Sequence, residues 1–288
     1  MLKVALFGGA GLVGSSIGVN LKNENFKITS FDFKESNLFD NFIISSNSPK
    51  KILQKLDEFN LCILAIQKQS GEKNNELLNF VNKEIPYLVS LKENLDKVIY
   101  ITSSLIDQNI DKDNFSTSVF EGERSFLQNN KNKNFIIIRP GNIISKKIPN
   151  YFKNLIDKLL QNNPVLVIGS GRLRIQFTIL EDLANYVAYA LKNETSKEIN
   201  IYSSFPIEIV DLVIALKMNI SSKSIILKIP AVFPILLIKF ISIFDKNYYP
   251  LIRIKALTKE NLKYDDLSNV IMQKNPIELF QNEYELND

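Results

Sequence analysis

The sequence predicts an α/β fold with a doubly wound parallel sheet, followed by a smaller α/β part on the C-terminal side. Apolar runs alternate with helical segments through the first 150 residues, the order typical of a parallel sheet. Two of these runs, 60–66 and 97–102, are apolar almost throughout, as in strands buried on both faces. Small or polar residues follow the runs, where ligands bind in such sheets.

The first element is an apolar strand, Lys3 to Phe7, that leads into Gly8, Gly11 and Gly14. Glycine lets a backbone bend this tightly and approach a ligand. A helix over Ser15 to Leu21 would direct its N-terminal N–H groups and positive dipole end at the turn. This spacing predicts a pyrophosphate site, although a βαβ unit without a ligand also contains such glycines.

Asp32 closes the second strand, Phe26 to Phe31, about 20 residues after the glycines, where a carboxylate holds both hydroxyls of an adenosine ribose. Strand, turn, helix, strand and acid together predict a Rossmann-type dinucleotide-binding unit. The charge of Asp32 repels a 2′-phosphate, so NAD is predicted over NADP, a preference that the neighbouring Lys34 softens.

The elements expected next continue the alternation. They are a weak strand at 41–45, a helix at 50–58, helices over 74–95 interrupted near Pro86, a helix at 121–129 and a strand at 135–138. We assign residues 1–150 to an NAD-binding domain. The cofactor is expected to contact Gly8, Gly11, Leu12, Val13, Gly14, Asp32, Ala65, Thr102, Ser103 and Pro140.

The pattern changes from Tyr151 onward. The elements expected there are a helix at 152–160, a strand at 165–168, a helix ending at Leu191, a strand at 198–202 and a helix at 209–216. We assign residues 151–288 to a smaller substrate-binding part, interleaved with the first.

The composition excludes several function classes. Of 288 residues 45% are hydrophobic and 23% charged, as in soluble proteins with a large core. The net charge of +4 is small, and runs such as Lys131 to Lys133 indicate a solvated loop, so no nucleic-acid partner is predicted. The chain has no His, which excludes a His base and a His-ligated metal, and no metal site is predicted.

The remaining compositional signals concern cysteine and targeting. Cys62, the one cysteine, lies within an apolar run, so we expect a buried strand residue and no intrachain disulfide. No signal peptide is visible before the first strand, so a cytoplasmic location is expected.

Five motifs resemble those of the extended short-chain dehydrogenases/reductases, the family of NAD-dependent nucleotide-sugar epimerases, dehydratases and ketoreductases. They are the glycine turn, Asp32, Val98 to Ser104, Ile138 to Asn142, and Gly169-x-Gly171 followed by Phe177 and Glu181 to Ala184. Tyr264 to Asp266 and Asn275-Pro276 are similar to the end of these enzymes. The resemblance implies NAD, a nucleotide-activated sugar, hydride transfer between them, and surface polysaccharide synthesis.

The family's proton-transfer residues are only partly present. Ser104 stands where the family has its catalytic Ser, although a small residue closing a strand would look the same. The family also uses a Tyr as proton carrier and a Lys four residues later. Phe115 and Val119 occupy those positions in the preferred register, in which Ser118 and Glu123 also match.

A second register would place Phe120 and Arg124 at the Tyr and Lys positions. Both registers put Phe where Tyr is needed, and Phe cannot carry a proton. Two interpretations stay open: a slow enzyme in which Glu121, Glu123 or a water substitutes, and a catalytically silent dinucleotide-binding protein with a regulatory or assembly role.

Substrate-binding residues follow from the resemblance alone. Relatives hold the nucleotide-sugar diphosphate with an Arg in the loop after Gly169. Here Ile175 occupies that position, and a shift of one residue would bring in Arg174, with Arg172 nearby. The motif after the sixth strand adds Asn142. Arg139 in the same motif either orders the strand end or touches the ligand.

The segment Ile225 to Phe244 is the most apolar stretch and about long enough to span a bilayer. Its lysines and prolines argue against a span, so a packed helix is predicted, with contact to a membrane surface or a subunit as the alternative. The resemblance also allows a homodimer formed through 74–95 and 121–129.

Overall fold

A computed structural model of the protein describes residues 2–46, 48–68, 75–104, 114–130, 134–145, 151–230, 232–233 and 274–284. The chain forms two compact units. The first takes its described residues from Met1–Asp107, Lys112–Pro140 and Leu180–Ile201, and the second from Gly141–Ile179 and Tyr202–Asp288. The division at residue 150 made from the sequence stays a prediction.

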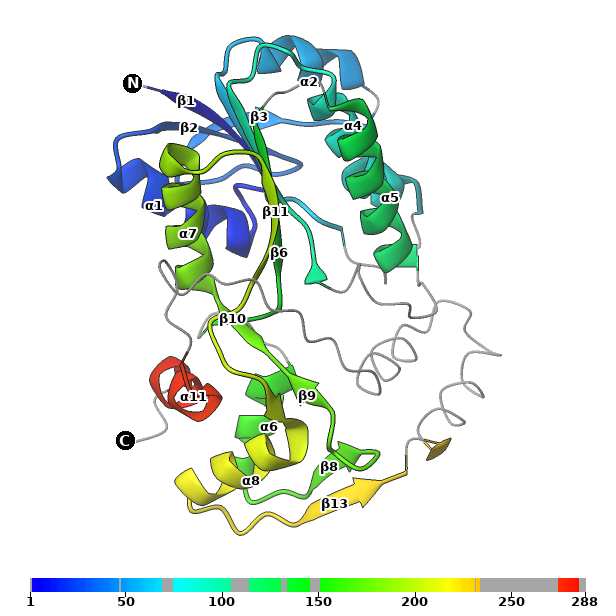
Figure 1. The fold of residues 1–288 in the computed structure, drawn as a ribbon, viewed down its shortest axis with the longest axis vertical. Coiled ribbons are helices and arrows are strands. Elements are labelled where there is room, and N and C mark those ends of the chain that lie inside the picture. Colours follow the sequence, from blue (N-terminus) through cyan, green and yellow to red (C-terminus); the bar gives the residue numbers. More distant parts are fainter. Residues whose placement is uncertain are drawn as a thin grey trace. The chain divides into compact units, whose positions relative to one another are not determined.

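The first unit is built on one seven-stranded sheet in which every pair is parallel. Figure 1 shows this sheet in the upper part of the view. In spatial order its strands are β11 (Lys197–Ile201), β6 (Phe135–Pro140), β5 (Lys97–Ile101), β4 (Leu61–Leu64), β1 (Lys3–Phe7), β2 (Lys27–Asp32) and β3 (Asp40–Ile43). The predicted doubly wound parallel fold is confirmed.

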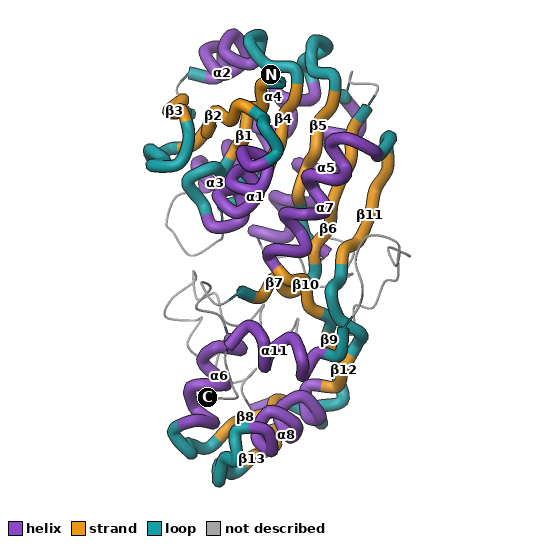
Figure 2. The backbone as a smooth tube through the Cα atoms, turned by 90° about the vertical axis from the view of Figure 1, so that its left-hand side faces the viewer, coloured by secondary structure: helices purple, strands orange, loops and turns teal. Residues whose placement is uncertain are grey.

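Helices cover both faces of the sheet because its inner strands are apolar on both. One face packs α1 (Leu12–Asn23) and α7 (Leu180–Asn193); Gly18 of α1 lies so close to Leu6 that a Cβ would come within 2.9 Å of its side chain. The other face carries Phe7, Cys62 and Tyr100 in a buried cluster under the remaining helices (Figures 1 and 2). Those helices are α2 (Pro49–Leu56), α3 (Asn75–Asn79), a π-helix (Phe80–Glu84), α4 (Ile85–Ser90) and α5 (Asn114–Asn129).

Two expectations for these helices need correction. The helix predicted at 121–129 begins at Asn114, since Phe115, Val119 and Phe126 extend its buried side. The interruption predicted near Pro86 is a π-helix just before it, at Phe80–Glu84. Proline has no N–H, so the backbone carbonyl of Asn82 cannot accept the usual α-helical hydrogen bond from residue 86. Pro86 itself fits the first turn of α4, where its N–H would have no intrahelical acceptor.

The second unit contains short sheets and helices around a core of its own. Its elements are β7 (Asn142–Ile144), α6 (Tyr151–Leu160), β8 (Val165–Ile168), β9 (Arg174–Ile175), β10 (Phe177–Ile179), β12 (Ile207–Glu208), α8 (Ile209–Asn219), β13 (Ile226–Ile229) and α11 (Pro276–Tyr284). The strand expected at 198–202 belongs instead to the first unit, where Lys197–Ile201 pairs with β6 at the edge of the large sheet.

Several sequence expectations lie outside the described residues: Lys131 to Lys133, Tyr264 to Asp266 and the part of the apolar stretch from Pro234 to Phe244. Within the described ranges, no helix combines the length and the apolar composition needed to cross a bilayer.

Lys97 ties β5 to the end of α7. Its buried ammonium group donates to the carbonyls of Ala190, Leu191 and Glu194 at 3.1, 2.7 and 3.0 Å. These carbonyls lie at and just beyond the end of α7, where carbonyls generally lack an intrahelical donor, although that of Ala190 also accepts from the Glu194 N–H at 3.2 Å. Burial lowers the pKa of Lys97, and the charge of Glu194 partly offsets this effect.

We predict that Lys97→Met lowers the free energy of unfolding by about 2 to 3 kcal/mol, because three buried carbonyls lose a charged donor while the side-chain volume is kept. Urea unfolding followed by circular dichroism measures this. The control is Lys55→Met, which removes an exposed ion pair to Glu58 and should cost less than about 1 kcal/mol. Equal losses in the two variants would contradict the capping role.

Candidate functional site

The turn after β1 has no room for side chains at two glycines. Gly8 has a φ of +87°, and a Cβ there would lie 2.6 Å from the carbonyl oxygen of Ala65. A Cβ on Gly14 would lie 2.1 Å from the carbonyl oxygen of Gly8. Both close neighbours are backbone atoms, so the glycines are required by the path of the turn itself.

The turn leads directly into the N-terminus of α1. Gly11 is the N-cap residue, its N–H donates to the Gly8 carbonyl at 2.9 Å, and Ser15 N–H returns to the Gly11 carbonyl at 2.8 Å. The N–H groups of Leu12, Val13 and Gly14 have no intrahelical acceptor, because Ser15 donates the first hydrogen bond of the helix. No acidic side chain occupies this first turn. The helix start therefore presents N–H donors and a positive dipole end suited to an anion.

Asp32 lies beside this turn at the end of β2. Its carboxylate accepts hydrogen bonds from the backbone N–H of Ala10 at 3.1 Å and of Phe33 at 2.7 Å. A carboxylate has about four lone-pair sites, so these two bonds leave acceptor capacity for ligand hydroxyls. The acid that the sequence predicted as a ribose ligand thus also braces the glycine turn.

The remaining predicted cofactor residues follow neighbouring strands on the same edge of the sheet. Ala65 comes directly after β4 and donates to the Phe7 carbonyl at 3.0 Å. Thr102 and Ser103 follow β5, and Pro140 closes β6. The Thr102 hydroxyl is buried without a hydrogen-bond partner within the described part of the chain. The carboxyl edge therefore gathers every predicted cofactor residue; their roles stay predictions.

The positions of the predicted catalytic pair are apolar and packed. Phe115 is 8% exposed and Val119 1% exposed, and they form a small cluster on α5 with Phe120. Ser104, which follows β5, is also buried. Tyr100 is a core residue packed against Phe126, and burial, reinforced by the charge of Glu123, raises the pKa of its phenol.

Asn82, in the π-helix, joins three segments at this side of the sheet. Its amide pairs with both backbone groups of Lys68, at 2.9 and 3.0 Å, and donates to the Ser118 hydroxyl at 2.8 Å. The backbone carbonyl of Asn82 faces Gly122 of α5, and a Cβ built on Gly122 would lie 1.8 Å from that carbonyl oxygen. Sequence reasoning missed this residue; the available signal was an Asn four residues before a Pro inside a helical segment.

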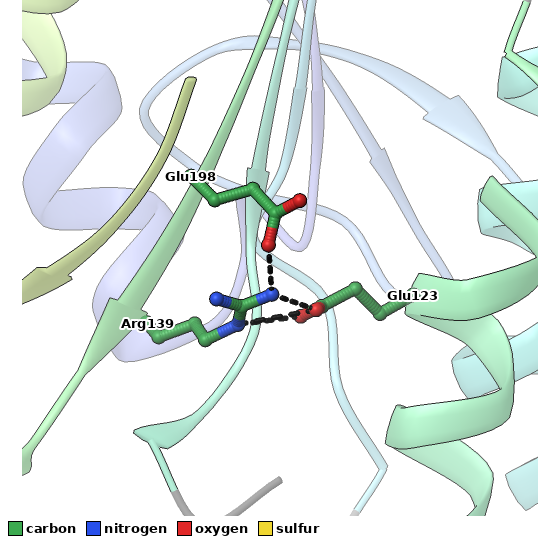
Figure 3. A network of polar contacts seen from close by, with 3 residues as sticks. All are labelled: Glu123, Arg139 and Glu198. Carbon is green, nitrogen blue, oxygen red and sulfur yellow. Dashed lines mark hydrogen bonds and ion pairs between the residues drawn. The ribbon is translucent and has the colours of Figure 1, made fainter. Parts of the chain in front are cut away.

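Arg139 is held by two carboxylates rather than presented to a ligand (Figure 3). Its Nε lies 3.1 and 3.2 Å from the two carboxylate oxygens of Glu123 on α5, and its terminal nitrogen also contacts Glu198 on β11. Burial opposes the charged form, but the bonds and charges of Glu123 and Glu198 outweigh it and raise the pKa of Arg139.

The two acids considered as substitute proton carriers are thus both engaged in ion pairs. Glu123 is buried against Arg139, and Glu121 pairs with Lys83. Each carboxylate is thus bound by a cation, and Glu123 is buried as well, so this arrangement does not favour the hypothesis that an α5 carboxylate replaces the missing Tyr.

The residues predicted to bind the substrate all lie in the second unit. Asn142 starts β7 and donates to the Gln176 carbonyl at 3.2 Å. Arg172 and Arg174 are exposed, whereas Ile175 is buried and pairs with Ile207. The alternation of β9 therefore turns the arginine at 174, and not residue 175, toward the surface; its role in binding stays a prediction.

Clusters suitable for a metal were also sought. The described residues contain no group of three His, Cys, Asp or Glu side chains that could hold a metal ion.

Comparisons with known proteins define the fold and leave the family open. No family model and no curated protein matches the sequence. Among solved structures the chain is similar to the UDP-glucuronic acid 4-epimerase of Bacillus cereus in complex with NAD, at 18% identity over 79% of this chain and 87% of that one, with a TM-score of 0.63.

Two further structures give the same fold. The UDP-glucose 4-epimerase of Thermotoga maritima, solved with UDP-glucose, is 12% identical over 80% of this chain and 86% of that one, with a TM-score of 0.66. Pal from Bacillus thuringiensis is 16% identical over 95% and 94%, with a TM-score of 0.65. The chain thus has the fold of nucleotide-sugar epimerases.

We predict that Arg139→Met lowers the free energy of unfolding by about 3 to 5 kcal/mol, because it leaves the buried Glu123 carboxylate unpaired. Thermal and urea unfolding measure the loss. Glu198→Gln is the matched control and should cost at most about 1 kcal/mol, since the Glu198 side chain is 43% exposed.

The double variant Arg139→Met/Glu123→Leu should recover most of the stability, because no unpaired buried charge remains. A double variant as unstable as Arg139→Met alone would show that the loss comes from packing instead of charge.

Proposed function

We propose that the protein binds NAD at the glycine turn and acts on a nucleotide-activated sugar as an epimerase-, dehydratase- or ketoreductase-like enzyme. One observation carries the proposal: a turn closed to side chains at Gly8 and Gly14 lies between the start of α1 and the carboxylate of Asp32. A dinucleotide has a pyrophosphate and a ribose diol with the matching spacing.

The residues present fit this cofactor. Leu12 and Val13 present N–H groups that have no intrahelical acceptor, and the buried Thr102 hydroxyl lacks a partner within the described residues. In the proposal Leu12 and Val13 donate their N–H groups to the pyrophosphate, and Asp32 accepts from the ribose hydroxyls. The negative charge of Asp32 favours NAD over NADP.

When bound, NAD supplies a hydride acceptor and donor next to the sugar. The chain's part is to position the sugar: Ser104 would donate a hydrogen bond to the reacting oxygen, and Asn142, Arg172 and Arg174 would bind the nucleotide sugar. Structures of similar fold include a complex with UDP-glucuronic acid and NAD, which supports this substrate class. We further place the activity in the cytoplasm, in surface polysaccharide synthesis.

A second candidate function is that of an NAD-binding protein without turnover, serving in regulation or assembly. Burial of Phe115 and Val119 in an apolar cluster favours it, because no group at these positions can carry a proton. Loss of a general acid or base typically costs about 10²- to 10⁴-fold in rate.

The proposal predicts that the purified protein releases NAD on denaturation, detected by mass spectrometry, or takes it up in calorimetry. Leu12→Pro tests the contact. Proline is accepted at the first helical position, and Gly11 already has the extended backbone (ψ 167°) that a residue before proline prefers, so the fold should persist while one N–H donor is lost.

We expect Leu12→Pro to weaken NAD binding about ten-fold or more with an unchanged melting temperature, because a charge-assisted hydrogen bond is lost. Leu12→Ala, which keeps the N–H, is the control. NAD affinity that is the same in both variants would place the pyrophosphate elsewhere.

The two functions are separated by restoring the missing pair as Phe115→Tyr with Val119→Lys. If the site is otherwise intact, turnover of a nucleotide sugar should appear or rise by about 10²-fold or more. Val119→Met controls for volume at this buried position, and thermal unfolding reports whether the lysine is tolerated. A folded double variant that binds NAD and nucleotide sugar yet stays inert would show that the register assigned to Phe115 and Val119, or the assignment of the pocket, is wrong.

A further inference from the structure

The strand order of the large sheet determines which part of a bound dinucleotide each strand end would face. β1 carries the glycine turn, β2 with Asp32 lies on one side of it, and β4 and β5 lie on the other side (Figure 2). In the proposed function the pyrophosphate lies at the turn and the adenosine ribose at Asp32. Because the pyrophosphate is the middle of the molecule, the nicotinamide half would lie over the ends of β4 and β5.

The segment 65–68, which follows β4, is anchored at this edge of the sheet. The Gln67 amide donates to the carbonyl of Ile101, the last residue of β5, at 3.2 Å. Lys68 is bound through both of its backbone groups by the side-chain amide of Asn82, at 2.9 and 3.0 Å. The backbone of Lys68 therefore has a defined position close to the end of β5.

The same anchor brings Lys68 close to the start of α5. The amide nitrogen of Asn82 donates both to the Lys68 carbonyl at 3.0 Å and to the Ser118 hydroxyl at 2.8 Å, so these two oxygens lie within about 6 Å of each other. The Ser118 hydroxyl in turn donates to the Phe115 carbonyl at 2.7 Å. A lysine thus lies beside the part of α5 where Phe115 and Val119 supply no charge.

Lys68 is half-buried, and a lysine carries its ammonium group on a flexible four-carbon stem. Within the described residues that follow β4 and β5, 65–68 and 102–104, it is the one charged side chain. Arg139, one residue before the end of β6, is neutralised by Glu123 and Glu198. A positive charge at this place disfavours the oxidised nicotinamide ring, which is itself a cation, relative to the neutral reduced ring.

We propose that the ammonium group of Lys68 binds the ribose of the nicotinamide half and places a positive charge beside the nicotinamide ring. The loop after β4 thereby supplies the cation that Val119 on α5 does not. This inference rests on the proposed binding of NAD at the glycine turn. It does not depend on turnover, because it concerns the affinity of the chain for the two redox forms of the cofactor.

The test is calorimetric titration of the full chain with NADH, with oxidised NAD and with ADP. We expect Lys68→Met to lower the affinity for NADH about ten-fold, because a charge-assisted hydrogen bond is lost. The preference for NADH over oxidised NAD should fall about five-fold, because the charge beside the ring is removed. ADP lacks the nicotinamide half, so its affinity should stay the same.

Two further variants control for charge and position. Lys68→Arg keeps the positive charge and should retain most of the preference for NADH. Lys83 follows Asn82 in the π-helix and pairs with Glu121 of α5, so Lys83→Met removes a neighbouring lysine and should leave the preference unchanged. Melting temperatures show that each variant is folded.

The outcomes separate this inference from the proposed function. If the unmodified chain binds none of the three nucleotides, the proposed function fails and the inference fails with it. If all three bind and Lys68→Met weakens them equally, Lys68 contacts the pyrophosphate, and only the inference is overturned. Unchanged affinities in Lys68→Met overturn it as well and leave the NAD site in place.

Discussion

The close approach of backbone to backbone at the end of β1 is the constraint on which the first unit depends. Gly8 touches the carbonyl of Ala65, and Gly14 touches the carbonyl of Gly8. These contacts set the angle at which α1 leaves the sheet and bring its free N–H groups to the carboxyl edge. Asp32 holds the same turn from the side through Ala10. The features that would bind a dinucleotide are therefore also the ones that give the turn its shape.

Helix α5 is held by several specific contacts, yet it has no proton-carrying side chain at Phe115 and Val119. The Asn82 amide donates to Ser118, the backbone carbonyl of Asn82 packs directly against Gly122, and Glu123 pairs with Arg139 of β6. These contacts fix the position of α5 against the sheet. Yet Phe115 and Val119, at the positions expected for proton transfer, are packed as core residues. The fold is that of nucleotide-sugar epimerases, while neither Phe115 nor Val119 can carry a proton, so the proposed enzyme and the proposed silent binding protein can be told apart by experiment.

The second unit shows a different kind of incompleteness. Its core contains Phe152, Phe177 and Phe280, whose ring centroids lie 4.8 to 5.7 Å apart. The sheet of β8 and β13 packs Val165 and Val167 into this core, while Leu166 and Leu227 on its other face are exposed. A single chain gains nothing from such a face, because apolar surface in water costs free energy in proportion to its area.

The sequence by itself determined the parallel sheet, the glycine turn and the place of Asp32, because these depend on local patterns: continuous apolar runs, glycine spacing and an acid at a strand end. The tertiary structure alone decided the rest. Whether Arg139 faced a ligand depended on Glu123 and Glu198, which are 16 and 59 residues away. The strand at 197–201 joined the large sheet through pairing with β6, and the small sheet of the second unit exists only because β8 pairs with β13. Such contacts between distant segments leave no periodic trace in a single sequence.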